Sequence, residues 1–454
     1  MKEIKKLEMT LADEGWDKSG GKSYNVWGFV DFPPELLAHI EKYKAKIQVS
    51  YDPTTGRKIK TIGKRSPVWT AYDKFLYNDY DPKTSKDPLP KISATFKSSF
   101  EHKYSPIVEN LGMQIAMKLD MPTSYNYIVS FNPEEYPEIV DNYPAFSQRE
   151  KLQPFGIVSI DFLQPRQIAL KPNGKSLYLP KDENGQFTGE EIDIDSFSGI
   201  DGDELITFED ALQRYHIGTN KLNGDENLIE NWIEVVDQMA RTEFKGLPRE
   251  KLSKMIDGIH SRVARSFLLK DCLLGDCDFT AYNGGIVANS RKMRYAATHD
   301  YGDICSGLIK HKFTFDPYCG MKKEDFEKLP KLVQEQILNS KNKQGNMSVK
   351  EIARSWASSV SERNFYYVLK NFPEACKEFF KNADTLIRKD TIPKIIDSYT
   401  QMTCNGVPLL TQEEADMFKE YLLERIAHYC KLYVEYLNQT HQEIPEAQDD
   451  EQSI

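Results

Sequence analysis

The sequence has no long apolar run, no paired cysteine motif and no excess of positive charge. No stretch approaches the roughly 18 apolar residues that a membrane-spanning helix needs, so we expect no membrane span. Residues 1–16 contain no apolar segment of the kind found in a secretory signal peptide. The net charge of −10 argues against a general nucleic-acid-binding protein, which would carry a basic surface. We therefore expect neither a membrane span nor direct nucleic-acid binding.

The seven cysteines are scattered along the chain and contain no Cys-x-x-Cys pair. An odd, scattered set argues against a disulfide framework and against a zinc finger, and it suits a reducing cytoplasm. Cys272 and Cys277 flank the most informative stretch of the chain, and we interpret them as small apolar packing residues. We therefore predict a cytoplasmic protein, with secretion as an effector left open.

A chain of 454 residues is too long for one ordinary hydrophobic core, so we predict two lobes. Residues 1–160 contain short apolar strands separated by turns, and they form the predicted β-rich N-terminal lobe. From Phe208 onward apolar residues recur at helical spacing, so residues 161–441 form a mainly helical C-terminal lobe. The tail, residues 442–454, is acidic and poor in apolar residues, which predicts disorder. The predicted fold class is α+β.

Two capping boxes mark helix starts in the C-terminal half. Ser348 begins the first box and predicts a helix through Val360. Thr411 begins the second box and predicts a long helix to about Asn438.

The densest group of candidate functional residues lies within residues 263–306. An apolar helical segment ends near Gly275, and Asp278 and Asn283 follow in the spacing Asp-x-x-x-x-Asn. Two predicted short strands then lead to a second acidic loop that contains Asp300. A strand–turn–strand between the two loops would bring both to one edge of a small sheet. This order suits phosphoryl transfer, in which one carboxylate takes a hydroxyl proton while an amide oxygen and a second carboxylate hold Mg²⁺.

This stretch resembles the catalytic core of the HipA-like serine/threonine kinases, which include bacterial toxin kinases and secreted CtkA-type kinases. In that family a helix runs into Gly-(Asn/Asp)-x-Asp-x-x-x-x-Asn, and a Phe-Asp-Tyr-Gly-like turn follows. Those positions here read Gly275-Asp276-Cys277-Asp278-Phe279-Thr280-Ala281-Tyr282-Asn283 and His299-Asp300-Tyr301-Gly302. The resemblance implies a bilobal protein-kinase-like fold, with Asp278 as catalytic base and Asn283 and Asp300 as metal ligands. Phe279 and Thr280 replace basic or His residues that are common in the family, which bears on substrate preference.

A second signal lies upstream. A predicted strand ends in Lys97, and the predicted helix that follows, residues 105–119, carries Glu109. Kinases use a strand lysine to contact the nucleotide phosphates and a helix glutamate to hold that lysine. The HipA-like family has the same unit, and the end of its helix resembles Ala116-Met117-Lys118-Leu119-Asp120-Met121-Pro122. The resemblance carries over Lys97 and Glu109, with Lys91 and Lys103 as alternative lysines.

The remaining nucleotide contacts leave weaker traces in the sequence. A Gly-containing loop around Lys64 and Ser66 is the better of two candidates for covering the phosphates, although it matches neither a Walker nor a kinase glycine pattern. An apolar strand at residues 155–162 stands where a kinase hinge binds adenine through backbone groups. Ile160 and Phe162 are therefore the predicted hinge residues.

Together these observations predict an ATP- and Mg²⁺-dependent serine/threonine protein kinase, which transfers the γ-phosphate to a protein substrate. Autophosphorylation is expected as well, with Ser66 or Thr70 as candidate sites, and an antitoxin or other regulatory partner is considered. Two alternatives stay open: a pseudokinase or adaptor that only binds partners, and a kinase whose acceptor is a small molecule or a lipid. The missing glycine-rich loop and Phe279 favour the adaptor, whereas the intact acidic loops favour the enzyme.

Overall fold

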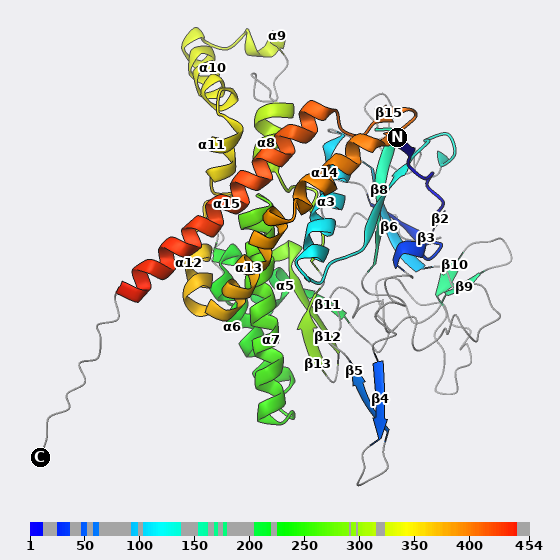
Figure 1. The fold of residues 1–454 in the computed structure, drawn as a ribbon, viewed down its shortest axis with the longest axis vertical. Helices are drawn as coiled ribbons and strands as arrows, with labels where there is room; N and C mark the ends of the chain where they lie inside the picture. Colours follow the sequence, from blue (N-terminus) through cyan, green and yellow to red (C-terminus); the bar gives the residue numbers. More distant parts are fainter. Residues whose placement is uncertain are drawn as a thin grey trace, which may run out of the picture.

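The computed structural model describes residues 1–11, 25–36, 47–51, 58–62, 92–98, 103–137, 153–161, 168–170, 176–178, 204–218, 225–289, 292–296, 298–314 and 323–442. Some of the positions predicted above lie outside these residues, namely Lys64, Ser66, Thr70, Lys91, Phe162 and the tail from residue 443. Strands dominate the N-terminal part and helices the C-terminal part, which confirms the α+β class (Figure 1).

The N-terminal part is built on a five-stranded antiparallel sheet in the order β2-β3-β6-β8-β7. Its strands are β2 (Thr10–Leu11), β3 (Asn25–Val30), β6 (Ile92–Ser98), β7 (Asn126–Ser130) and β8 (Phe155–Ile160). Strand β6 lies at the centre, and Lys97 in it pairs with Asn25 on one side and Ile157 on the other. Because side chains alternate along a strand, Phe96 and Lys97 point to opposite faces of this sheet.

Two separate hairpins accompany this sheet. One consists of β4 (Ile47–Tyr51) and β5 (Lys58–Ile62), and the other of β9 (Ile168–Leu170) and β10 (Ser176–Tyr178).

The helix α3 (Tyr104–Lys118) joins the sheet to the helical part. It packs against β7 and β8 on one side and against α14 (Thr391–Gln401) on the other. Asn110 and Gln114 of α3 both hydrogen-bond the hydroxyl of Tyr399, at 2.8 and 3.0 Å. Helix α3 is therefore held from both sides, and eleven of its fifteen residues are buried.

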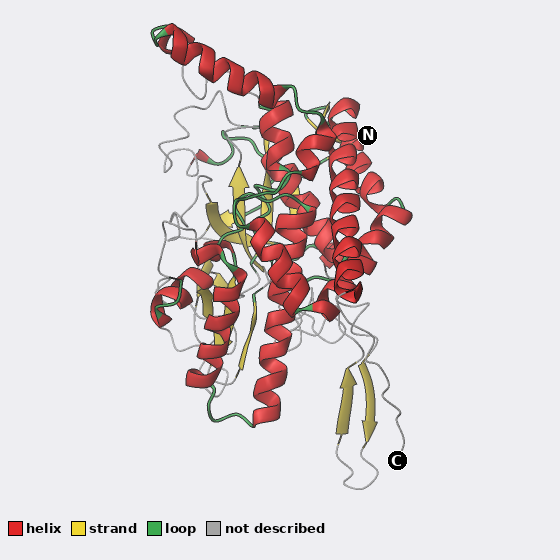
Figure 2. Cartoon of the chain, turned by 90° about the vertical axis from the view of Figure 1, so that its left-hand side faces the viewer, coloured by secondary structure: helices red, strands yellow, loops and turns green. Residues whose placement is uncertain are grey.

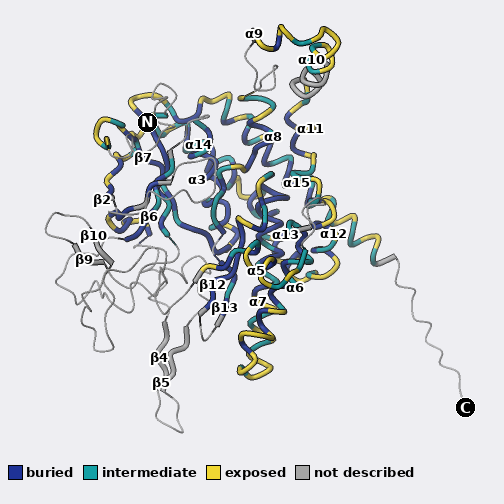
Figure 3. Tube along the Cα trace, turned by 180° about the vertical axis from the view of Figure 1, so that it is seen from behind, coloured by how far each residue is buried: buried dark blue, intermediate teal, exposed yellow. Residues whose placement is uncertain are grey.

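The C-terminal part packs its helices around a continuous buried core (Figures 2 and 3). Its helices are α5 (Phe208–Tyr215), α6 (Ile229–Glu243), α7 (Arg249–Phe267), α8 (Ser306–Leu308), α9 (Lys323–Phe326), α10 (Lys331–Gly345), α11 (Val349–Arg354), α12 (Ser361–Asn371), α13 (Pro373–Arg388), α14 and α15 (Gln412–Gln442). Single-turn or π-helical segments are η6 (Asp225–Asn227), η7 (Leu268–Leu273), η8 (Ala281–Asn283) and η9 (Ile309–Phe313). Helix α15 runs diagonally across the C-terminal part, and α9 and α10 project outward from that part (Figure 1). No helix within the described ranges combines the length and the apolar character needed to cross a membrane.

A small antiparallel sheet lies beside α7, in the order β11-β12-β13. Its strands are β11 (Glu204–Thr207), β12 (Gly285–Asn289) and β13 (Lys292–Tyr295). The β12–β13 hairpin is the strand–turn–strand predicted between the two acidic loops, and that prediction is confirmed.

A third sheet ties the start of the chain to its C-terminal part. Strand β1 (Lys2–Glu3) pairs in parallel with β14 (Met402–Cys404), which pairs with β15 (Val407–Pro408). The amide of Leu7 donates to the carbonyl of Ser130 in β7 at 2.9 Å. Residues 1–7 therefore bridge the N-terminal sheet and the helical part.

Both predicted capping boxes are present, but one helix is shorter than predicted. Ser348 and Glu351 form the reciprocal bonds, yet α11 ends at Arg354 instead of Val360. The buried guanidinium of Arg425 donates hydrogen bonds to the carbonyls of Ala353 and Ser355, at 2.9 and 2.8 Å. Ser355 has an extended backbone conformation. Tertiary bonds to these carbonyls thus end the helix where local sequence did not predict an end.

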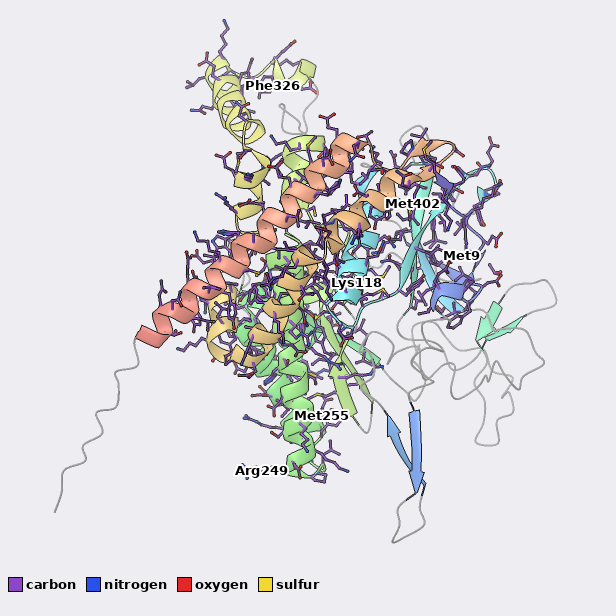
Figure 4. All side chains as sticks on the ribbon, viewed as in Figure 1. Met9, Lys118, Arg249, Met255, Phe326 and Met402 are labelled. Carbon is purple, nitrogen blue, oxygen red and sulfur yellow. The ribbon has the colours of Figure 1, made fainter. Side chains whose placement is uncertain are left out.

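Helix α7 extends away from the core, and its two ends lie in different environments. Arg249 marks its outer end, and Met255 lies six residues further in (Figure 4). The other end continues as η7 into the buried centre of the helical part. This buried end leads directly to the loop with Asp278.

Two mid-helix glycines should respond oppositely to alanine. A Cβ on Gly112 in α3 would lie 2.5 Å from the ring of Tyr301, whereas a Cβ on Gly258 in α7 would meet nothing within 4 Å. Alanine favours helix over glycine, so Gly258→Ala should raise the free energy of unfolding by about 0.5–1 kcal/mol. Gly112→Ala should lower it by about 1–3 kcal/mol because α3 must move off the Tyr301 ring. Urea unfolding of both variants measures this, and stabilisation by Gly112→Ala would contradict the packing described.

Candidate active site

The loop that carries Asp278 begins where η7 ends. Gly275 has a φ of 66°, and a Cβ there would collide with the hydroxyl of Tyr421. The amide of Asp276 donates to the carbonyl of Lys270 at 2.9 Å, and the amide of Cys305 donates to the carbonyl of Leu274 at 2.8 Å. The start of the loop is therefore held by backbone bonds, and glycine at residue 275 is required for the turn.

Asp278 and Asn283, predicted as base and metal ligand, contact each other. The Nδ2 of Asn283 donates to the carbonyl of Asp278 at 2.6 Å and to its Oδ2 at 3.1 Å. Asp278 is exposed, whereas Asn283 is 8% exposed. The amide nitrogen of Asn283 thus orients the aspartate, and Oδ1 of Asn283 is the atom that its predicted role as a metal ligand would use.

Asp300 follows the β12–β13 hairpin in a turn held by the N-terminal part. The amide of Thr298 donates to the carbonyl of Pro122 at 2.9 Å, and the amide of Ser124 donates to the carbonyl of Thr298 at 3.1 Å. Asp300 itself has a φ of 55°, a left-handed conformation that is uncommon for residues other than glycine. The buried hydroxyl of Tyr301 lies 3.0 Å from that of Thr123.

Lys97 crosses from the N-terminal sheet to this turn. Its Nζ lies 3.1 Å from Oδ1 of Asp300, and the two side chains are 19% and 39% exposed. Glu109 is 4% exposed and accepts a hydrogen bond from the backbone of Tyr301. A Cβ on Gly302 would lie 3.5 Å from Oε2 of Glu109 and 3.7 Å from Oδ1 of Asp300. The structure therefore brings Lys97, Glu109 and Asp300 together, with the lysine paired to the aspartate.

The charges of these three groups determine their protonation. The charge of Lys97 lowers the pKa of Asp300 well below its usual value, although burial opposes this. Burial alone would lower the pKa of Lys97, but the charges of Asp300 and Glu109 raise it above its usual value. Burial raises the pKa of Glu109, and the charge of Lys97 only partly offsets this. Lys97 and Asp300 are consequently an ionised pair at neutral pH.

One basic residue at this place, Lys270, was not singled out from the sequence, and Asp276 was named there only as part of the loop motif. Lys270 in η7 has a fully buried side chain whose Nζ lies 3.0 Å from Oδ2 of Asp276. Burial raises the pKa of Asp276 to about 6, although the charge of Lys270 lowers it. The signal that could have found the pair is a lysine inside the apolar run Phe267–Leu274, one turn before the acidic loop.

Asp303 is a further acidic residue near the group. It is exposed, and its charge raises the pKa of both Lys97 and Asp276. Asp303 therefore belongs to the same group of charged residues as Lys97 and Asp276, and it is exposed to solvent.

The predicted hinge residue Ile160 lies at the end of β8, next to the central strand. Its amide donates to the carbonyl of Tyr125 at 2.7 Å, and the amide of Asp161 donates to the carbonyl of Ser93 at 3.1 Å. Both amides are used within the sheet, so adenine recognition at this place stays a prediction.

The residues present fit a magnesium–nucleotide complex better than a metal held by protein alone. Within the described ranges, no three His, Cys, Asp or Glu side chains gather into a metal cluster. Asn283 and Asp300 offer one amide oxygen and one carboxylate, and Mg²⁺ commonly combines one or two such groups with phosphates and water.

Asp271, next to Lys270, is buried beneath this site. Its Oδ2 accepts a hydrogen bond of 2.7 Å from Ser361 of α12, and its carbonyl accepts one of 2.7 Å from Arg425. Burial raises the pKa of Asp271 to about 7, although the Ser361 bond and the charge of Arg425 lower it.

Asp271→Asn should flatten the pH dependence of stability. A carboxyl whose folded pKa exceeds its unfolded value binds more protons when folded, so stability falls as pH rises between those two values. The free energy of unfolding falls by about 1.4 kcal/mol per pH unit from about pH 4 to about pH 7. Above about pH 7 this group causes no further change. Asparagine can keep the Ser361 bond without titrating. Urea unfolding between pH 5 and pH 8 should show a shallower slope for the variant, and equal slopes would contradict the assignment.

Comparisons with known proteins found similar solved structures but no similar sequence. No family model matches the chain, and no curated protein matches it in sequence. Its structural neighbours are HipA and CtkA kinases. One is described as the Helicobacter pylori proinflammatory kinase CtkA, at 12% identity and a TM-score of 0.39, covering 76% of this chain and 92% of that chain. Another is the Shewanella oneidensis MR-1 toxin–antitoxin system of HipA, HipB and operator DNA, at 11% identity and a TM-score of 0.37, covering 78% of this chain and 61% of that chain.

Proposed function

We propose that this chain is an ATP-dependent serine/threonine protein kinase of the HipA-like type. The observation that supports it most is the ion pair of 3.1 Å between Lys97 of the N-terminal sheet and Asp300 of the second acidic loop. Phosphoryl transfer depends on a lysine and a metal-binding carboxylate at the same phosphates. Two residues far apart in sequence meet here with that chemistry, and α3 supplies the buried Glu109 beside them.

Each residue has a role that follows from its contacts. Asp278 is exposed, and because Asn283 bonds its Oδ2, its Oδ1 is left to accept the proton of a Ser or Thr hydroxyl. Asn283 and Asp300 would hold Mg²⁺, which would supply positive charge to offset the charge of the nucleotide phosphates. Lys97 is charged at neutral pH, since its pKa is raised, and it can pass from Asp300 to an incoming phosphate. Glu109 lies beside Lys97 and accepts a hydrogen bond from the backbone of Tyr301.

The proposal also specifies which class of molecule accepts the phosphate. We assign a protein Ser or Thr hydroxyl, with autophosphorylation as the first reaction to test. A regulatory partner, analogous to the HipB that accompanies the HipA of the Shewanella structure, is included in the proposal. A small-molecule or lipid acceptor, or a pseudokinase, are the competing outcomes.

Asp278→Asn should abolish phosphate transfer while leaving the fold intact. General-base catalysis contributes about 10²–10⁴-fold, so we expect a loss of that size in the rate of phosphate incorporation from ATP·Mg²⁺. Radiolabelled γ-phosphate and intact-mass spectrometry measure the transfer. Asp257→Asn, an exposed aspartate on α7, is the matched control and should keep the full rate.

The same assay separates the alternatives. Undiminished incorporation in Asp278→Asn would refute the proposed base. Transfer to a polyol or to lipid vesicles, with none to protein, would change the acceptor class. An absence of both phosphate transfer and a Mg²⁺-dependent thermal shift with ATP would favour the pseudokinase.

A further inference from the structure

One buried ammonium group contacts both acidic loops of the candidate site. The Nζ of Lys270 lies 3.0 Å from Oδ2 of Asp276, 3.1 Å from the carbonyl of His299 and 2.7 Å from the carbonyl of Asp300. A lysine ammonium has three donors, and three acceptors surround this one. The side chains of Lys270 and Asp276 are 0% and 1% exposed.

The contacts continue from Lys270 to the residues of the proposed chemistry. The Oδ1 of Asp276 accepts the amide of Asp278 at 2.9 Å, so the ion pair fixes the backbone of the proposed base. On the other side, the two carbonyls belong to the residues that place the Asp300 carboxylate. The same ammonium group therefore sets the position of both loops.

Two aromatic rings close this contact off from water. The Nζ of Lys270 lies 5.3 Å from the ring centre of Phe279 and 5.5 Å from that of Tyr301, and both rings are buried. Distances of this size allow a cation–π attraction in addition to exclusion of solvent. Phe279 follows the proposed base and Tyr301 follows the proposed metal ligand, so each loop contributes one ring.

The backbone around Lys270 is also unusual. Residues 268–273 form a π-helical segment, and such segments in α-helices frequently occur at functional sites. Lys270 lies within this segment, at the point where it contacts both loops.

We propose that Lys270, with Asp276, is a positioning residue that sets the distance between the catalytic loop and the metal-binding turn. The inference rests on the proposed function for its catalytic consequence. Lys270 does not contact substrate, because its side chain is buried and its ammonium group is surrounded by Asp276 and two backbone carbonyls. It acts through Asp276, Asp278 and Asp300.

The test uses the full chain with Lys270→Met and with the double variant Lys270→Met/Asp276→Asn. The single variant leaves a buried carboxylate without its cation, and the double variant removes both charges while Asn keeps an acceptor for the Asp278 amide. We expect the double variant to unfold at a higher urea midpoint than the single one. In both, we expect kcat for phosphate transfer to fall at least 10-fold and KM for ATP·Mg²⁺ to rise.

A second readout does not depend on activity. Hydrogen exchange of the backbone across residues 299–305, which includes the Tyr301 amide, should become at least 10-fold faster in both variants. Leu386→Ala in the buried face of α13 is the control, because it lowers stability away from the loops and should leave exchange at residues 299–305 unchanged.

The two readouts separate this inference from the proposed function. If the parent protein transfers no phosphate, the proposed function fails, and the exchange measurement alone decides the role of Lys270. A double variant with parental exchange at residues 299–305 overturns the inference, whatever the activity. Faster exchange in the double variant together with unchanged exchange in Leu386→Ala supports it.

Discussion

The candidate site depends on one buried positive charge. Moving an ion out of water costs several kcal/mol, and the cost is offset only when good partners surround it. Lys270 has a carboxylate and two carbonyls within 3.1 Å, so its burial is compensated by contacts from two loops that are distant in sequence. Neither loop can shift without leaving a charge or a carbonyl unpaired in the core. This couples the geometry of Asp278 to that of Asp300.

A second constraint fixes the N-terminal side of the site. Helix α3 carries Glu109, and its first turn is bound by Glu414 of α15, which accepts from Lys103 at 2.8 Å and from the Tyr104 hydroxyl at 2.6 Å. The same Glu414 completes the capping box with Thr411. One carboxylate thus begins α15 and anchors α3. The ion pair between Lys97 and Asp300 forms across parts of the chain that these contacts already hold together.

The sequence was sufficient for the local features and insufficient for the contacts between them. The β12–β13 hairpin and both helix starts follow from turn and capping residues, which act over a few positions. The end of α11 does not, because Arg425 lies far along the chain. Lys97, Glu109, Asp278, Asn283 and Asp300 could be selected by spacing and family resemblance. Lys270 was missed, although a lysine inside an apolar run is a visible signal, because two of its three partners are backbone carbonyls, which carry no residue-specific signal.

The departure at Phe279 has a physical consequence. Its ring packs edge-on against Trp232 at 5.3 Å and lies over Lys270, so the residue after the proposed base belongs to the core. A cation is nevertheless present beside the loop, because the exposed Lys310 of η9 lies 3.6 Å from the sulfur of Cys277. A positive charge from a later helix therefore lies beside Cys277, whereas Phe279 shields the buried ion pair of Lys270 and Asp276.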